Sequence, residues 1–434
     1  MLKKSFYMPM PLAQPNKLKR DIVSSDLAFQ LLQVNAILVI VGYALAVTND
    51  MEPVKPFQWF KIGLLGISIL HIASLPTSVL RLIYYSTQGA HGLCILLIGS
   101  SFLADNFILS ITRTLTFIIP FLYILYVIGY LLLRYDIESV FHAFIRSYFL
   151  VYSLPVLFYF FLLGELERTN IYSIAYENPD SWFVSNHYGW ASILVFVTVI
   201  DMLQNIEINR FTRIFLVLTG LVSLYLMLIS GSRSSWLSLL LVICIYLFPR
   251  RKTHYMWKFL LVCIPLGAAY LLSYDADSAV SRRIEKTKLQ LKVGEPRHTT
   301  GERMFRYFNK NPILYLKGIG LFNQSTITNV TGSKGYHNSY LEILFGAGIS
   351  TFALFFYLIV LRPTWIYWYF FSDRYVLLPP LLIIPFFESN LTAGQFYFYP
   401  WFTFLLFWSY FPRFTYIKCK IDPELTSRRI KPFD

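Results

Sequence analysis

Long apolar stretches alternate with short polar connections along most of the chain. Most stretches approach the roughly 20 residues that an α-helix needs to cross the hydrocarbon core of a bilayer. The pattern therefore predicts an all-α polytopic membrane protein with about 12 transmembrane helices. Pro379, Pro380 and Pro385 interrupt the eleventh stretch, which we expect to be broken or tilted. The expected spans are approximately 27–47, 57–77, 88–104, 114–133, 143–164, 184–203, 213–230, 234–248, 257–273, 340–361, 376–388 and 396–412.

The charges in the connections indicate how these helices are oriented. With the N-terminus inside, the cytoplasmic connections carry basic residues such as Arg81 and Arg134, whereas the short outer connections are neutral or acidic. Cytoplasmic loops of membrane proteins carry an excess of Lys and Arg. We therefore expect the N-terminal tail, residues 1–26, and the basic C-terminal tail, residues 413–434, to be cytoplasmic.

Residues 274–339 form the one long connection, and this topology places them outside. They include eleven basic and five acidic residues, but long loops translocate regardless of charge. Loops of this length usually carry function. The pattern predicts an amphipathic helix at the membrane surface over 280–293, and a second helix over 299–309 that ends before Pro312.

The composition supports this class of protein. Of 434 residues, 56% are hydrophobic and 14% are charged, against about 25% charged in soluble domains. Too few charges remain to cover soluble domains, which excludes a soluble enzyme and a disordered chain. The net charge of +14 fits the orientation rule and anionic headgroups, so we expect membrane lipids and no nucleic acid as partners. The four cysteines have neither disulfide nor metal spacing.

Three polar sites interrupt or adjoin the predicted spans. Arg233 lies in a tight turn between two spans, where its guanidinium could bind phosphate oxygens or reach lipid headgroups. Arg303 and Arg306 are three residues apart, on one face of a loop helix that is either functional or simply solvated. His337 precedes the tenth span, and it is either a residue whose proton moves near neutral pH or a structural histidine.

Seven short motifs follow one another along the chain: Ser185-Asn186-His187-Tyr188-Gly189, Ser232-Arg233-Ser234-Ser235-Trp236, Gly301-Glu302-Arg303, Asn311-Pro312, Gly318-Ile319-Gly320, His337-Asn338-Ser339-Tyr340-Leu341-Glu342 and Gly346-Ala347-Gly348-Ile349. In this order and topology, they resemble the motifs of the bacterial O-antigen ligase and O-antigen polymerase superfamily. The first motif lacks the usual Asn-Pro-Asn form, which leaves the role of its histidine open.

The resemblance implies an inverting glycosyltransferase that uses neither metal nor cofactor. Its donor would be an oligosaccharide on undecaprenyl diphosphate, and its acceptor a lipid-linked glycan or the lipid A core, with a chain-length regulator protein as a further partner. The implied roles are catalysis for His337, diphosphate binding for Arg233, Arg303 and Arg306, and acceptor binding or orientation for Asn338, Glu342, Asn186 and His187.

The expected location is the bacterial inner membrane, with the active site facing the periplasm. Three functions stay open, of which we favour polymerisation of repeat units. A ligase would instead attach the finished glycan to the lipid A core. A flippase or exporter would need ionisable residues near the middle of the membrane, whereas the residues singled out here lie at its outer edge.

Overall fold

The fold is all helical wherever the structure defines it. The computed structural model describes residues 56–135, 140, 192–193, 195–200, 202–203, 209–229, 239, 296–332, 338–370, 409–410, 413–414 and 416–417. Helices are the regular elements of these ranges, which contain no strand. The all-α class is therefore confirmed for the described part of the chain.

Three described helices are long and apolar enough to cross a membrane: Phe107–Arg134, Arg210–Met227 and Tyr340–Ile366. A sharply bent pair, Leu65–Ser74 and Thr77–Ser86, makes a fourth if it counts as one span. The total of 12 stays a prediction. Half of the positions in the expected span 184–203 are described, and they are helical. The expected spans that lie wholly or largely outside the described residues are 27–47, 143–164, 234–248, 257–273, 376–388 and 396–412, together with the amphipathic helix over 280–293.

The first described helices begin where two spans are expected, and they end a few residues earlier. Helix α4 (Pro56–Ser74) ends before Pro76, and α5 (Thr77–Ser86) leaves at 106°. Proline lacks the N–H that would continue the helix, so the expected span 57–77 is bent at its end. Helix α6 (Gln88–Ser101) has 14 residues, fewer than expected for 88–104. At 1.5 Å per residue it is about 21 Å long, less than the hydrocarbon thickness.

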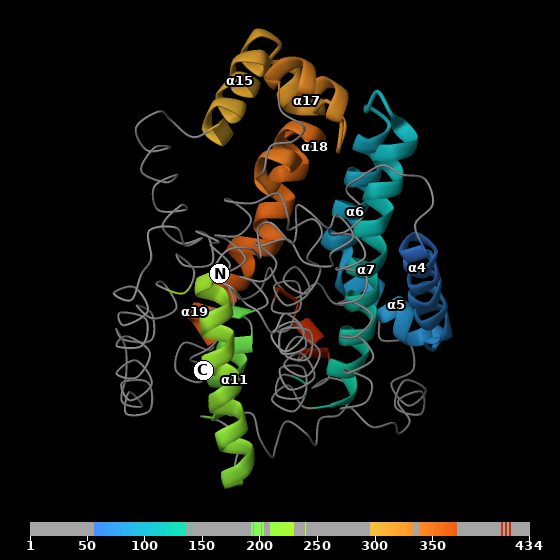
Figure 1. Ribbon diagram of the computed structural model, residues 1–434. Coiled ribbons are helices and arrows are strands. Elements are labelled where there is room, and N and C mark those ends of the chain that lie inside the picture. Colours follow the sequence, from blue (N-terminus) through green and yellow to red (C-terminus); the bar gives the residue numbers. More distant parts are fainter. Residues whose placement is uncertain are drawn as a thin grey trace, which may run out of the picture.

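Helix α7 (Phe107–Arg134) is the long element against which α4, α5 and α6 pack (Figure 1). It begins at Asn106, whose side chain accepts a hydrogen bond from the Leu109 N–H. Hydrogen bonds link α7 to α4 and α6. The Tyr123 hydroxyl lies 3.0 Å from Nδ1 of His71, and the Tyr126 hydroxyl lies 2.9 Å from Nε2 of His91. These bonds satisfy polar groups within an otherwise apolar bundle.

Helix α11 (Arg210–Ile229) agrees closely with the expected span 213–230. Asn209 begins the helix by accepting a hydrogen bond from the Thr212 N–H at 2.8 Å. Inside the helix, the hydroxyls of Thr219 and Ser223 donate to carbonyls one turn earlier. Local bonds of this kind let hydroxyl side chains sit in an apolar helix without leaving a donor unpaired.

The second half of the described chain surrounds one long, interrupted helix. The predicted helix 299–309 is confirmed as α15, and the predicted span 340–361 corresponds to α18 and the π-helix after it. In Figure 1, α15 and α17 lie over one end of α18, and α6 packs beside α18. The elements are α15 (Pro296–Lys310), α16 (Ile313–Lys317), α17 (Gln324–Thr331), α18 (Ser339–Phe356), the π-helix (Tyr357–Leu361) and α19 (Arg362–Phe370).

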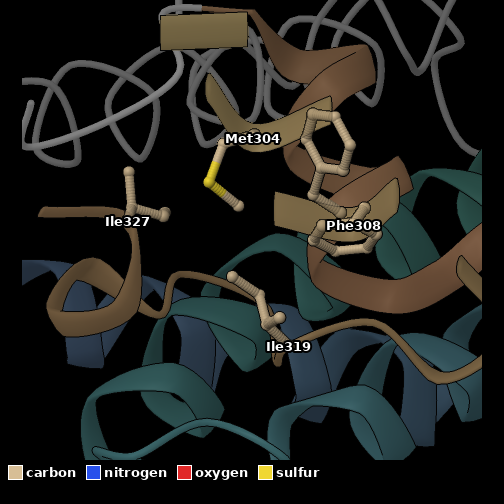
Figure 2. Packing of buried hydrophobic residues seen from close by; sticks show 5 residues of the cluster. Met304, Phe308, Ile319 and Ile327 are labelled. Atoms are coloured by element: carbon tan, nitrogen blue, oxygen red, sulfur yellow. The ribbon is translucent and has the colours of Figure 1, made fainter. Parts of the chain in front are cut away.

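A buried apolar cluster joins α15, α17 and α18 (Figure 2). Phe308 is fully buried, and its ring lies 4.7 Å from that of Phe345 between centroids. The remaining members are Met304, Ile319 and Ile327. Burial of large apolar side chains is the main term that stabilises such a packing, so this cluster fixes the segment 296–332 on α18.

Candidate functional site

Two glycine pairs place the segment after α16 directly against α18. The N–H groups of Ile319 and Gly320 donate to the carbonyls of Phe345 and Gly346, each at 2.9 Å. A Cβ atom on Gly318 would lie 2.2 Å from the Gly346 carbonyl oxygen, well inside contact distance. The Gly318-Ile319-Gly320 motif thus allows backbone to pack on backbone, a role that leaves no room for a side chain.

The segment after α16 packs on α18 at a break in that helix. Gly348 has φ 81° and ψ 170°, a conformation open essentially only to glycine. The break interrupts the helical hydrogen-bond ladder, and the carbonyls just before it accept the two bonds from the segment 319–320. A Cβ on Gly348 would lie 2.2 Å from the Leu316 carbonyl oxygen. The small-residue motif at 346–349 is therefore the surface on which the Gly318-Ile319-Gly320 motif packs.

The Gly301-Glu302-Arg303 motif packs against the start of α18. A Cβ on Gly301 would touch the Leu341 side chain at 3.4 Å, and Met304 is fully buried beneath it. Arg303 contacts a different element, because its Nη1 donates to the Thr331 carbonyl at 2.7 Å, at the end of α17. This bond engages one of the five N–H donors of the guanidinium and orients its plane.

Arg306 has a different setting from Arg303, although both lie on α15. Its side chain is 78% exposed and pairs with Glu302 at 3.9 Å. An exposed pair of this kind contributes little to stability and leaves the guanidinium free to move. Of the two loop arginines, the structure orients Arg303 alone.

Asn338 and Glu342 both organise the start of α18. The Asn338 side-chain oxygen caps the helix by accepting hydrogen bonds from the N–H groups of Tyr340 and Leu341, at 2.9 and 3.1 Å. The Glu342 Oε1 accepts the Phe322 N–H at 3.1 Å, so it ties the helix to the turn that follows Gly320. Both side chains therefore help to fix the structure at the start of α18, and their roles toward the acceptor stay a prediction.

The α6–α7 connection contributes residues that sequence reasoning missed. The Asp105 carboxylate accepts hydrogen bonds from the hydroxyls of Ser325 and Thr326, at 2.5 and 2.9 Å, and the Ser110 hydroxyl donates to the Leu321 carbonyl at 2.6 Å. The hydroxyl bonds stabilise the charged form of the carboxylate and lower the pKa of Asp105. Sequence separations of 211 to 221 residues hid these contacts.

Sequence reasoning also missed Arg113, although the sequence carries a sign of it. It is a charged residue inside the apolar helix α7, where a charge is costly. The structure places its guanidinium 5.9 Å from the Phe322 ring centroid and near enough to Glu342 for a favourable charge interaction. A charge in this position is normally paired with another group of the protein.

Four candidates from the sequence, Asn186, His187, Arg233 and His337, lie outside the described residues. The chain enters the described range again at Asn338, directly after His337. Within the described ranges, no group of three or more His, Cys, Asp or Glu side chains is placed to hold a metal ion. Among the described candidates, Arg303, Asn338 and Glu342 belong to segments that pack on one another. Arg303 and Arg306 are both exposed, but Arg303 is hydrogen-bonded to the end of α17, whereas Arg306 is paired with Glu302 of its own helix.

In the part of the chain that the structure describes, these features define an all-helical protein with apolar helices long enough to cross a membrane, in which residues 296–332 are folded onto a broken apolar helix. Residues 218–356 match the family model described as O-Antigen ligase, a range that includes Arg303 and the motif 337–342. The match confirms the resemblance to the O-antigen ligase and polymerase superfamily, whose members are glycosyltransferase-like enzymes, and it supports an activity of that general type. No curated protein and no solved structure matches the chain.

Proposed function

We propose that this protein transfers a glycan from undecaprenyl diphosphate to an acceptor sugar hydroxyl, at the periplasmic face of the bacterial inner membrane. The observation that carries the proposal is the contact between two matched motifs. The Gly301-Glu302-Arg303 segment packs on Leu341 of the 337–342 motif, while Arg303 is oriented by the end of α17. One small region thus holds a fixed guanidinium and the helix start that follows His337.

The proposed reaction is a single displacement. The acceptor oxygen attacks the anomeric carbon, the bond from that carbon to the diphosphate oxygen breaks, and the polyprenyl diphosphate leaves with the electron pair. Arg303 and Arg233 would stabilise the negative charge that develops on the leaving group, and Arg306 would strengthen the local positive field. His337 would take the proton of the attacking hydroxyl. Attack from the face opposite the leaving group inverts the anomeric configuration.

The acceptor decides between the two enzymes of this class. We favour a polymerase, in which the acceptor is another lipid-linked oligosaccharide, over a ligase acting on the lipid A core. A deletion strain separates them through its surface glycan. A single repeat unit on the core indicates a lost polymerase, and long lipid-linked glycan without core attachment indicates a lost ligase. Normal, core-attached glycan of full length would contradict both.

His337→Ala tests the catalytic assignment. Turnover should fall by about 10²- to 10⁴-fold, the usual contribution of a general base, while donor affinity is retained because the arginines remain. The measurement uses the purified full-length protein in nanodiscs with lipid-linked donor, and it determines donor affinity and turnover separately. His298→Ala is a matched control in the same loop, and it should retain activity. Turnover of His337→Ala close to wild type would move the base elsewhere, first to His187.

A further inference from the structure

A strained turn within the segment 318–326 is hydrogen-bonded to the start of α18. Phe322 has φ 54°, and it is the one non-glycine residue with positive φ in the described part of the chain. Its N–H donates to Glu342 Oε1, and its side chain is buried. Bulky side chains adopt this conformation at an energetic cost, so surrounding contacts must hold it. We call residues 320–323 the Phe322 turn.

Helix α7 also contacts the Phe322 turn. The Ser110 hydroxyl donates to the Leu321 carbonyl at 2.6 Å, and the Arg113 guanidinium lies 5.9 Å from the Phe322 ring centroid. Ser110 and Arg113 are three residues apart and therefore share one face of the helix. A cation over an aromatic ring at this distance is attracted to it.

The setting of Arg113 calls for an explanation beyond packing. It lies within the apolar helix Phe107–Arg134, about two turns from its start. A charge at such a position is expensive and is retained where it has a partner. Here the guanidinium lies 5.9 Å from the Phe322 ring centroid, and a favourable charge interaction with Glu342 adds to this contact.

The neighbouring α6–α7 connection strengthens the same attachment. A Cβ on Gly320 would lie 2.4 Å from the Ala104 nitrogen, which shows how closely the two backbones approach. Asp105 bonds the hydroxyls of Ser325 and Thr326 at the beginning of α17. Helix α17 ends at Thr331, whose carbonyl orients Arg303. A continuous set of contacts therefore leads from α7 to both Glu342 and Arg303.

We propose that Arg113 is a positioning residue for glycosyl transfer, holding the Phe322 turn and Glu342 so that the start of α18 is correctly placed relative to Arg303. The inference rests on the proposed function, because it concerns the same site. It assigns a role to α7, which lies far outside the matched region 218–356. Arg113 touches neither donor nor acceptor on this view, so its loss should affect turnover more than donor binding.

The test compares Arg113→Gln with Arg134→Gln in the full-length protein. Arg134 is a matched control, because it lies at the other end of α7 and also faces an aromatic ring, that of Tyr135 at 4.9 Å. Arg113→Gln should lower kcat by on the order of 10-fold, since small misplacements of catalytic groups have effects of this size or larger, with donor KM within about twofold. Arg113→Lys keeps the charge and should recover activity to within about threefold of wild type.

A double-mutant cycle with Glu342→Gln separates a shared action from two independent ones. If Arg113 acts through Glu342, the double variant should be no slower than the slower single variant. Multiplicative losses would overturn the proposal, as would a kcat of Arg113→Gln close to wild type or a loss confined to KM. Should Arg113→Gln fail to accumulate in the membrane, Arg113→Leu, which also removes the charge, takes its place in the cycle with Glu342→Gln, and multiplicative losses again overturn the proposal.

Hydrogen exchange gives a readout that does not depend on the reaction. Arg113→Gln should speed amide exchange over residues 318–326, where the Phe322 N–H is bonded, while Arg134→Gln should not. Unchanged exchange would overturn the positioning role even if the enzyme is active, and faster exchange with normal kcat would reduce it to a structural contact. Absence of glycan transfer by the wild-type protein would instead overturn the proposed function, leaving the exchange result to decide the role of Arg113 in the turn.

Discussion

Arg303 and Arg306 carry the same charge on the same helix, but they differ in the partners that hold their side chains. Arg303 is hydrogen-bonded to the Thr331 carbonyl, which fixes the plane of its remaining donors. Arg306 is exposed and has a long, weak pair with Glu302. The three-residue spacing places both on one helical face, but only the fold of α17 distinguishes them, and no local pattern could reveal that.

Arg303→Lys tests whether glycan transfer needs the planar set of guanidinium donors at this position. Lysine keeps the charge but loses the planar set of donors, so transfer should fall by about 10²-fold or more if the guanidinium binds diphosphate. Arg306→Lys on the same helix should stay within about threefold of wild type. Turnover with lipid-linked donor, normalised to protein in the membrane, gives the comparison. Equal effects of the two changes would mean that Arg303 has no special role.

The hydrogen bonds of Asp105 should make the stability of this region depend on pH. Its pKa is lowered in the folded protein by the Ser325 and Thr326 hydroxyls, so the unfolded chain binds the proton more readily. The stabilisation is therefore complete above the ordinary pKa of about 4 and is lost as pH falls through the lowered value. Amide exchange over residues 322–332, corrected for the intrinsic rate, should be constant from about pH 7 to pH 5 and rise only at lower pH. A rise between pH 7 and pH 5 would exclude Asp105 as the cause.

Helix α18 shows what a single sequence reveals about an element. Its apolar length predicts a span, and the structure has a helix there. The break at Gly348 and the five-residue π-helix after Phe356 interrupt that helix, and neither changes the hydropathy of the stretch. The bend before α5 is different, because Pro76 is a visible cause. Long-range backbone contacts such as Gly318 on Gly346 lie beyond any local pattern.

Gly348→Ala should disrupt the packing of residues 316–320 on α18. The new Cβ would lie 2.2 Å from the Leu316 carbonyl oxygen, and the backbone conformation itself costs a non-glycine residue about 1–3 kcal/mol. We expect a lower unfolding temperature in nanodiscs and faster proteolysis within residues 310–332. Gly99→Ala in α6 is the control, because a Cβ there meets nothing within 4 Å. Similar unfolding temperatures for the two variants would argue against the close backbone approach.

At the scale of the molecule, the sequence identifies the motifs but not their support. The motifs at 301–303, 318–320, 337–342 and 346–349 can be recognised without a structure, and those of their residues that the structure describes are brought together. The contribution of α7 and of the α6–α7 connection could not be foreseen. Their contacts join residues more than 200 positions apart, and Ser110 or Asp105 have no distinguishing pattern around them.

The topology is a prediction for the whole molecule. The charge distribution places residues 274–339 in the periplasm and the connection near residue 253 in the cytoplasm. Alkaline phosphatase is active only outside, so a fusion at residue 320 should be active and one at residue 253 inactive. The reverse result would place the site on the cytoplasmic face and remove the lipid-linked donor of the outer leaflet from consideration.

The close approach of Gly320 to Ala104 also limits how this protein can be recombined. A chimera that transplants residues 218–356 into a related membrane protein would bring the glycine but not its counterpart. A larger side chain than alanine at the receiving position would meet the Gly320 backbone, so the graft would assemble poorly even with every motif intact. The smallest transferable unit therefore includes residues 101–113, and a chimera with this second graft should regain function that the single graft lacks.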